Sequence, residues 1–170
     1  MELGLEGRLC VVTGGTRGIG AATARMLAAE GARPITVARS GADVELDLSA
    51  PDAGERLLAA CPEPPWALVN NAGTTGTRTL DELTDEDWNE QWELHVMAAM
   101  RVMRAFAPAM AGAGGGRIVN VSSSSGRRPS QTLDPAYSVT KAAQLSLSRL
   151  FADRWADQGV LVNAVLPGPT

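Results

Sequence analysis

The stretch Leu9-Cys10-Val11-Val12-Thr13-Gly14-Gly15-Thr16-Arg17-Gly18-Ile19-Gly20 decides the fold. Its first five residues are an apolar run that predicts a buried strand. The glycines that follow predict a tight turn, and apolar residues at helical spacing after Gly20 predict a helix that ends at Gly31. A strand, a glycine turn and a helix in this order are typical of a unit that holds a diphosphate at the helix N-terminus. A structural loop without a ligand is the alternative for such a motif.

Short apolar runs alternate with helical patterns along the rest of the chain. This alternation predicts a parallel α/β sheet. We expect further strands at residues 35–38, 44–46, 66–69, 117–121 and 160–165. We expect long helices at about residues 85–110 and 135–158, the second with Asp134 as its N-cap and Pro135 at its first position. Only residues 40–43 separate the second strand from the third, so we expect no helix between them.

The composition fits one soluble globular domain, residues 1–170, without repeats or linkers. The chain is 45% apolar with a formal net charge of −4, which gives no electrostatic case for a nucleic acid or an anionic membrane as partner. No apolar run approaches the ~20 residues of a membrane span, and the first residues lack a signal-peptide core, so we expect a cytoplasmic protein. Cys10, Cys61 and the sole histidine, His95, fit no metal or disulfide pattern, so we expect no metal site.

Tyr137 is the only tyrosine of the chain and Lys141 is its only lysine, whereas arginine supplies all the other basic side chains. Residues four apart share a face of a helix. An ammonium beside a phenol favours the phenolate and lowers a pKa that starts near ~10, so such a tyrosine can exchange a proton near neutral pH. The alternative is coincidence on a solvated helix face.

Four motifs occur in a defined order: Gly14-x-x-x-Gly18-x-Gly20, Asn70-Asn71-Ala72-Gly73, Tyr137-x-x-x-Lys141 and Pro167-Gly168. With them the chain resembles the classical short-chain dehydrogenases/reductases, the subgroup that includes the ketoacyl carrier-protein reductases. The resemblance implies a Rossmann-type, doubly wound parallel sheet of about six strands in the order 3-2-1-4-5-6, within three α/β/α layers. It also implies an NAD(P)-dependent oxidoreductase that interconverts a carbonyl and a secondary alcohol by hydride transfer.

The second strand bears on the choice of nicotinamide cofactor. In this fold an acid after that strand binds the ribose 2′-hydroxyl, and a base there accommodates a 2′-phosphate. The strand ends at Ala38-Arg39, and Arg17 adds a cation within the glycine turn, so we expect NADP(H) rather than NAD(H). The alternative is that Arg39 merely faces solvent.

The resemblance implies a cofactor site along the whole chain, with Asp47 and Leu48 at the adenine and Thr170 at the carboxamide. The implied cofactor-binding residues are Gly14, Thr16, Arg17, Gly18, Ile19, Gly20, Arg39, Asp47, Leu48, Asn71, Ala72, Gly73, Tyr137, Lys141, Pro167 and Gly168.

The resemblance also implies the catalytic roles. Tyr137 is the general acid, Lys141 lowers its pKa and binds the nicotinamide ribose, and a serine upstream orients the substrate oxygen. The candidates are the four consecutive serines Ser122 to Ser125. Counting back from Gly126 selects Ser123, whereas counting from Tyr137 selects Ser124, and we favour Ser123. Where many family members carry an asparagine that holds a water linked to the lysine, this chain has His95, which we add to the catalytic candidates. The alternative is a histidine satisfied by packing.

Family members continue beyond the Pro167-Gly168 motif with a substrate-covering segment and a last strand. We expect an enzyme whose sequence lacks that segment here; a fragment and a non-catalytic dinucleotide-binding homologue are the alternatives. In the family the two long helices pair between subunits, so we expect a homodimer or homotetramer. The small or flexible residues on the first of these helices are Ala98, Ala99, Met103 and Ala105. The alternative is that they pack only on their own sheet.

Overall fold

The computed structural model describes residues 3–168 and contains one six-stranded sheet. Its strands are β1 (Leu9–Thr13), β2 (Arg33–Ala38), β3 (Val44–Glu45), β4 (Ala67–Asn70), β5 (Gly116–Val121) and β6 (Val160–Val165). They lie in the order β3-β2-β1-β4-β5-β6, and every neighbouring pair is parallel. This confirms the expected Rossmann-type sheet and its strand order.

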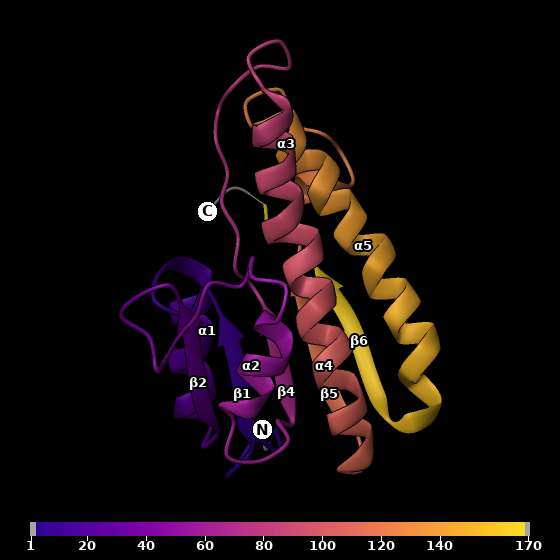
Figure 1. Ribbon diagram of the computed structural model, residues 1–170. Helices are drawn as coiled ribbons and strands as arrows, with labels where there is room; N and C mark the ends of the chain where they lie inside the picture. Colours follow the sequence, from indigo (N-terminus) through magenta and orange to yellow (C-terminus); the bar gives the residue numbers. More distant parts are fainter. Residues whose placement is uncertain (1–2, 169–170) are drawn as a thin grey trace.

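Helices cover the two faces of the sheet unequally (Figure 1). One face is covered by α2 (Ala53–Ala59), α4 (Ala98–Gly112) and α5 (Pro135–Trp155), and the other by α1 (Gly18–Ala29). The long helical rod in front of the sheet consists of α3 (Asp85–Trp92), a π-helical turn (Glu93–Met97) and α4.

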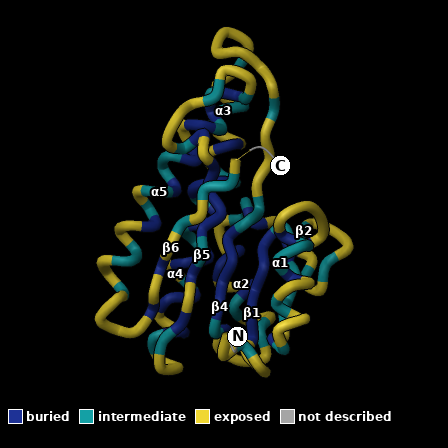
Figure 2. The backbone as a smooth tube through the Cα atoms, turned by 180° about the vertical axis from the view of Figure 1, so that it is seen from behind, coloured by how far each residue is buried: buried dark blue, intermediate teal, exposed yellow. Residues whose placement is uncertain are grey.

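The core follows from the alternation of side chains along each strand. Val11 and Ile118 point to the face of α2 and α4, where they pack with the fully buried Phe106. Val12 and Val121 point to the opposite face, which α1 covers. Figure 2 shows β1 and β4, at the centre of the sheet, as almost entirely buried.

Among residues 3–168, strand β6 lies at the edge of the sheet and one of its faces is uncovered. Its residues Leu161 and Val165 are exposed and share the face that α1 covers over β1. The layer formed by α1 therefore does not extend over β6.

The helices differ from the sequence prediction in two places. The seven-residue helix α2 was not predicted, although Asp52 before it is a typical N-cap residue. The helix predicted at residues 85–110 is interrupted by the π-helical turn Glu93–Met97, and α4 extends to Gly112. The prediction that no helix separates β2 from β3 is confirmed.

Asp134 occupies the predicted N-cap position of α5, but its carboxylate does not cap that helix. The carboxylate accepts hydrogen bonds from the backbone N–H of Arg78 (2.6 Å) and from Nε2 of Gln91 (3.0 Å). Asp134 therefore ties the loop after β4, and helix α3, to the start of α5.

None of the helices within residues 3–168 combines the length and the apolar character that a bilayer crossing requires.

Candidate active site

A cleft of about 350 Å³ opens at the carboxyl ends of the central strands, beside the N-terminal half of α5. This is where an open parallel sheet binds ligands, because the connections from β1 and β4 run to opposite sides there. Its lining residues are Arg17, Ile19, Asn71, Gly73, Thr74, Thr75, Val121, Ser122, Ser123, Tyr137, Lys141 and Pro167. The cleft thus brings together residues of all four sequence motifs.

The glycine turn is locked onto the end of β4. Nδ2 of Asn71 donates to the carbonyl oxygens of Thr13 (3.0 Å) and Gly14 (3.1 Å). A Cβ atom at Gly20 would lie 2.2 Å from the Gly14 oxygen and 2.4 Å from Nδ2 of Asn71, so only glycine fits there. Gly18 has a φ of 54° and open space beside it. The turn therefore leaves an accessible backbone that a diphosphate can approach.

Asn70 lies beneath the cleft and joins two strands. Its Nδ2 donates to Oδ1 of Asn120 at 2.8 Å, between the ends of β4 and β5. Asn70 is buried and outside the cleft lining, as expected for a residue that fixes the strand end.

Lys141 is held in place by acceptors of the protein. Its side chain is 4% exposed, and Nζ donates to the carbonyl oxygen of Val121 (2.8 Å) and to Oε1 of Gln144 (3.1 Å). Nζ lies 5.6 Å from the centroid of the Tyr137 ring. Burial lowers the pKa of Lys141 to about 8, so the ammonium form dominates at neutral pH. None of the ion pairs within residues 3–168 includes Lys141.

His95 lies in the π-helical turn and is fully buried. Burial, and then the charge of Lys141, lower the pKa of His95 to about 3, so the imidazole is neutral. The backbone N–H of Thr74 donates to Nε2 at 3.0 Å, which places the proton on Nδ1. Nδ1 then donates to Oγ1 of Thr140 at 2.8 Å, and Thr140 donates to the Tyr137 carbonyl oxygen at 3.0 Å. Both ring nitrogens are engaged by protein groups, which favours packing over the water-binding alternative.

The four consecutive serines after β5 differ in position. Ser122 and Ser123 line the cleft, whereas Ser124 is exposed and lies outside that lining. Oγ of Ser122 donates to the Lys141 carbonyl oxygen at 2.8 Å. Oγ of Ser123 accepts from the backbone N–H of Ser125 at 3.1 Å, which leaves its own hydroxyl proton for a ligand.

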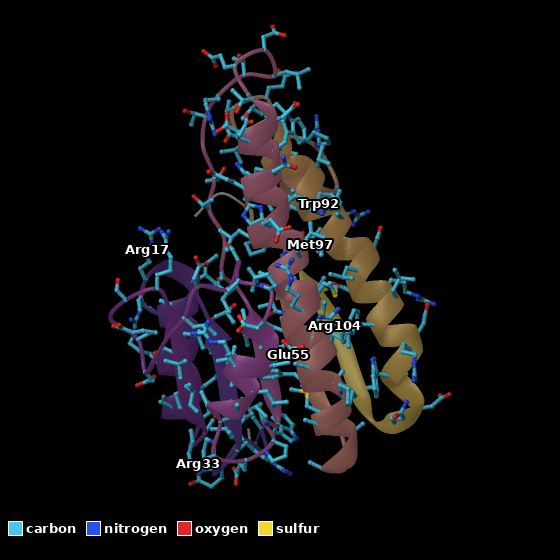
Figure 3. All side chains as sticks on the ribbon, viewed as in Figure 1. Arg17, Arg33, Glu55, Trp92, Met97 and Arg104 are labelled. Carbon is cyan, nitrogen blue, oxygen red and sulfur yellow. The ribbon has the colours of Figure 1, made fainter. Side chains whose placement is uncertain are left out.

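The two arginines expected at the cofactor lie on the surface. Arg17 lines the cleft and projects outward from the turn before α1 (Figure 3). Arg39 is exposed in the loop after β2. That loop is anchored by Asp43, whose Oδ2 accepts from the backbone N–H (2.8 Å) and the hydroxyl (2.7 Å) of Thr36.

Several other expected cofactor residues lie outside the cleft lining: Gly14, Thr16, Gly18, Gly20, Arg39, Asp47, Leu48, Ala72 and Gly168. Among them, Asp47 is exposed, whereas Leu48 is buried in the main core. Thr170, expected at the carboxamide, lies outside the described residues.

The sequence analysis did not single out Thr74, Thr75 or Val121, which also line the cleft. Thr74 and Thr75 follow the motif at residues 70–73, and Val121 ends β5 just before the serines, so their places near the carboxyl ends of strands were the available signal. Within residues 3–168, no three His, Cys, Asp or Glu side chains gather as a metal site.

A family model described as short chain dehydrogenase matches residues 8–61 and 44–170. The chain is a short-chain dehydrogenase/reductase. Members of this family are NAD(P)-dependent oxidoreductases that act on carbonyl or alcohol groups, and this protein is therefore such an oxidoreductase. The similarity to ketoacyl carrier-protein reductases agrees with the expected assignment of the chain to the classical subgroup.

Two curated relatives of this short-chain dehydrogenase/reductase illustrate the range of the family. The uncharacterized oxidoreductase YvrD of Bacillus subtilis is 37% identical over 188 residues, a stretch that covers all of this chain and 71% of that protein. The 3-oxoacyl-[acyl-carrier-protein] reductase FabG of Escherichia coli is 33% identical over 184 residues, which cover 98% of this chain and 75% of that protein.

A solved structure with a similar fold is L-sorbose reductase from Gluconobacter frateurii, complexed with NADPH and L-sorbose. It superposes with a TM-score of 0.90 at 34% identity, over 99% of this chain and 72% of that chain.

Proposed function

We propose that this short-chain dehydrogenase/reductase uses NADP(H) to interconvert a carbonyl and a secondary alcohol, with Tyr137 as general acid and base. The observation that carries this proposal is that Ser123, Tyr137 and Lys141 line one cleft together with Arg17 of the glycine turn.

The proposed roles follow from the chemistry of these three side chains. The nicotinamide, when bound, supplies or accepts the hydride. In the reducing direction Tyr137 donates its phenolic proton to the substrate oxygen. The Lys141 ammonium, 5.6 Å from the ring centroid, stabilises the negative charge that this leaves on the phenol. The hydroxyl of Ser123 donates to the same substrate oxygen and so fixes the carbonyl in position.

The preference for NADP(H) is proposed from charge. Guanidinium groups bind phosphate through paired hydrogen bonds. Arg17 lies in the glycine turn and Arg39 follows β2, the two segments at which we expect the 2′-phosphate. Two similar structures contain this cofactor: L-sorbose reductase with NADPH, and a putative gluconate 5-dehydrogenase from Beutenbergia cavernae with NADP. The open backbone at Gly18 fits the approach of the diphosphate.

We assign His95 a positioning role. Its neutral ring holds Thr74 of the cleft rim and, through Thr140, the backbone of Tyr137. A neutral imidazole with both nitrogens occupied has no free position for a relayed proton.

The small and flexible residues of α4 cannot form the subunit contact of the expected homo-oligomer, so another surface is required. Ala98, Ala99 and Met103 are buried within their own chain, and Ala105 packs against the same core. The exposed apolar residues on the long helices are instead Trp92 (42% exposed), Val139 (48%) and Leu150 (65%). We propose that helix pairing between subunits uses α3 and α5, and light scattering gives the subunit number.

The test of the proposed activity is a coupled binding and turnover experiment. NADPH binding is measured by fluorescence, and NADPH oxidation is followed with L-sorbose, L-tagatose and a 3-oxoacyl thioester, compounds chosen from the names of similar proteins. We expect binding of NADPH and oxidation with at least one carbonyl. NADPH binding without turnover of any of these compounds would favour the alternative, a non-catalytic dinucleotide-binding protein. The absence of NADPH binding would refute the cofactor assignment.

A further inference from the structure

Gln144 is a buried polar residue that the proposed reaction does not use. It stands seven residues after Tyr137 and three after Lys141 on α5, so the three side chains share one face of the helix. Its exposed fraction is only 2%. A buried primary amide is costly unless its donors and acceptor find partners, so its contacts are informative.

Both ends of the Gln144 amide are occupied. Nε2 donates to the carbonyl oxygen of His95 at 2.6 Å, and Oε1 accepts from Nζ of Lys141 at 3.1 Å. The opposite orientation would set an NH₂ group against the ammonium and one oxygen against another. These two partners therefore fix the amide in a single orientation.

The His95 carbonyl is a distinctive anchor for this amide. It belongs to the π-helical turn Glu93–Met97, where the regular bonding of the α-helix is interrupted. The bridge from Lys141 through Gln144 to His95 therefore ties α5 to this turn through buried groups only.

We propose that Gln144 is a positioning residue that fixes the Lys141 ammonium by linking it to the His95 carbonyl. Because this amide occupies one side of the ammonium and does not relay a proton, we infer that Lys141 exchanges its proton toward the cleft. The inference rests on the proposed function, because it assigns its importance to the role of Lys141 there.

Few groups stabilise the charged form of Lys141, so the loss of one acceptor should shift the pKa of its side chain measurably. The titratable groups that face it are the neutral His95 from the π-helical turn and Tyr137 from α5. No ion pair within residues 3–168 supplies it with a carboxylate. The charged form of Lys141 therefore depends on two acceptors, the Val121 carbonyl and Gln144.

The experiment uses the fact that Lys141 is the only lysine. Labelling lysine with ¹³C at Cε gives one side-chain resonance, whose pH titration reports the pKa of Lys141 directly. In Gln144→Met the amide acceptor is lost at similar volume, so we expect this pKa to fall by about one unit. In Gln144→Glu a carboxylate faces the ammonium, so we expect the pKa to rise. We expect kcat of Gln144→Met to fall about tenfold, with a smaller change in KM.

Gln91→Met is the matched control, because it makes the same change at another buried glutamine, which contacts Asp134 rather than Lys141. Its Lys141 titration should equal that of the unmodified protein. If Gln144→Met titrates like the unmodified protein, or if Gln91→Met shifts the resonance equally, the inference is overturned. If Gln144→Met does not fold, an unchanged or lowered pKa in Gln144→Glu overturns it instead.

The titration of Lys141 does not depend on turnover. The positioning role of Gln144 and the proposed enzymatic function can therefore be refuted independently. A shifted resonance in Gln144→Met, with no carbonyl reduced by the unmodified protein, would keep the bridge and refute the proposed function. Turnover by the unmodified protein, with an unshifted resonance in Gln144→Met, would do the reverse.

Discussion

The imidazole of His95 lies edge-on to the phenol ring of Tyr137, with the two ring centroids 5.6 Å apart. The only histidine of the chain, which is fully buried, thus packs against its only tyrosine, which lines the cleft. Burial and the charge of Lys141 lower the pKa of His95 and keep the imidazole neutral, while hydrogen bonds from Thr74 and to Thr140 hold it in one tautomer. The position of Tyr137 therefore depends on a buried base that must stay unprotonated.

This dependence predicts a loss of stability in mild acid. The pKa of His95 is about 3 in the folded protein against 6.5 for an ordinary histidine, so below pH 6.5 the unfolded state binds a proton that the folded state does not. The stabilising effect is complete above pH 6.5 and is lost as the pH falls toward 3. From the histidine alone we expect a decrease of about 2 kcal/mol in the free energy of unfolding between pH 7 and pH 5. Urea unfolding at these two pH values measures it.

A matched variant separates this effect from general acid sensitivity. His95→Asn removes the titrating ring, so its unfolding free energy should vary much less between pH 7 and pH 5. The lowered pKa of about 2 at Asp87 acts on stability only below 3.8, outside this window. Equal pH dependence in both proteins would contradict the account.

The sheet and its glycine turn were predictable because their signals are local. Apolar runs mark the strands, whereas the strand order was implied by the family resemblance that the four motifs carry. The positions of Tyr137 and Lys141 on one helix face were also predictable, since four residues make about one turn. The structure places both side chains in the cleft, as that spacing required.

The structural features that the sequence did not predict depend on contacts between segments that are distant in the sequence. The π-helical turn changes a hydrogen-bonding register, and no residue type marks such a change in the sequence. The role of Asp134 required a loop more than fifty residues earlier to fold back onto α5. Gln144 had one local signal, its spacing from Tyr137 and Lys141, but its burial became visible only with the neighbouring turn in place.

The choice between the two candidate serines is decided by a pair of single substitutions. Ser123 lines the cleft and Ser124 is exposed outside it. We expect Ser123→Ala to lower kcat/KM about 100-fold, the size seen when one donor to a reacting oxygen is removed. Ser124→Ala should change kcat/KM by less than about twofold, as for an ordinary surface residue. The opposite order of effects would move the assignment to Ser124.

The cofactor preference is tested by removing the two surface arginines near the proposed 2′-phosphate. We expect Arg17→Ala and Arg39→Ala each to raise the Kd for NADPH about tenfold, because each loses charge-assisted hydrogen bonds, and to leave the Kd for NADH nearly unchanged. Arg33→Ala is the control. Arg33 is also exposed, but it lies at the opposite end of the sheet, where it pairs with Glu63 (Figure 3). Equal losses for NADPH and NADH would refute the role of the arginines in choosing the cofactor.

The most direct test of the account is the turnover of Tyr137→Phe beside its affinity for NADPH. The change removes the phenolic oxygen and keeps the ring that packs against His95. We expect kcat/KM to fall by roughly 10²- to 10⁴-fold, the size of a lost general acid, while the Kd for NADPH changes little. Near-normal turnover in this variant would contradict the proposed chemistry.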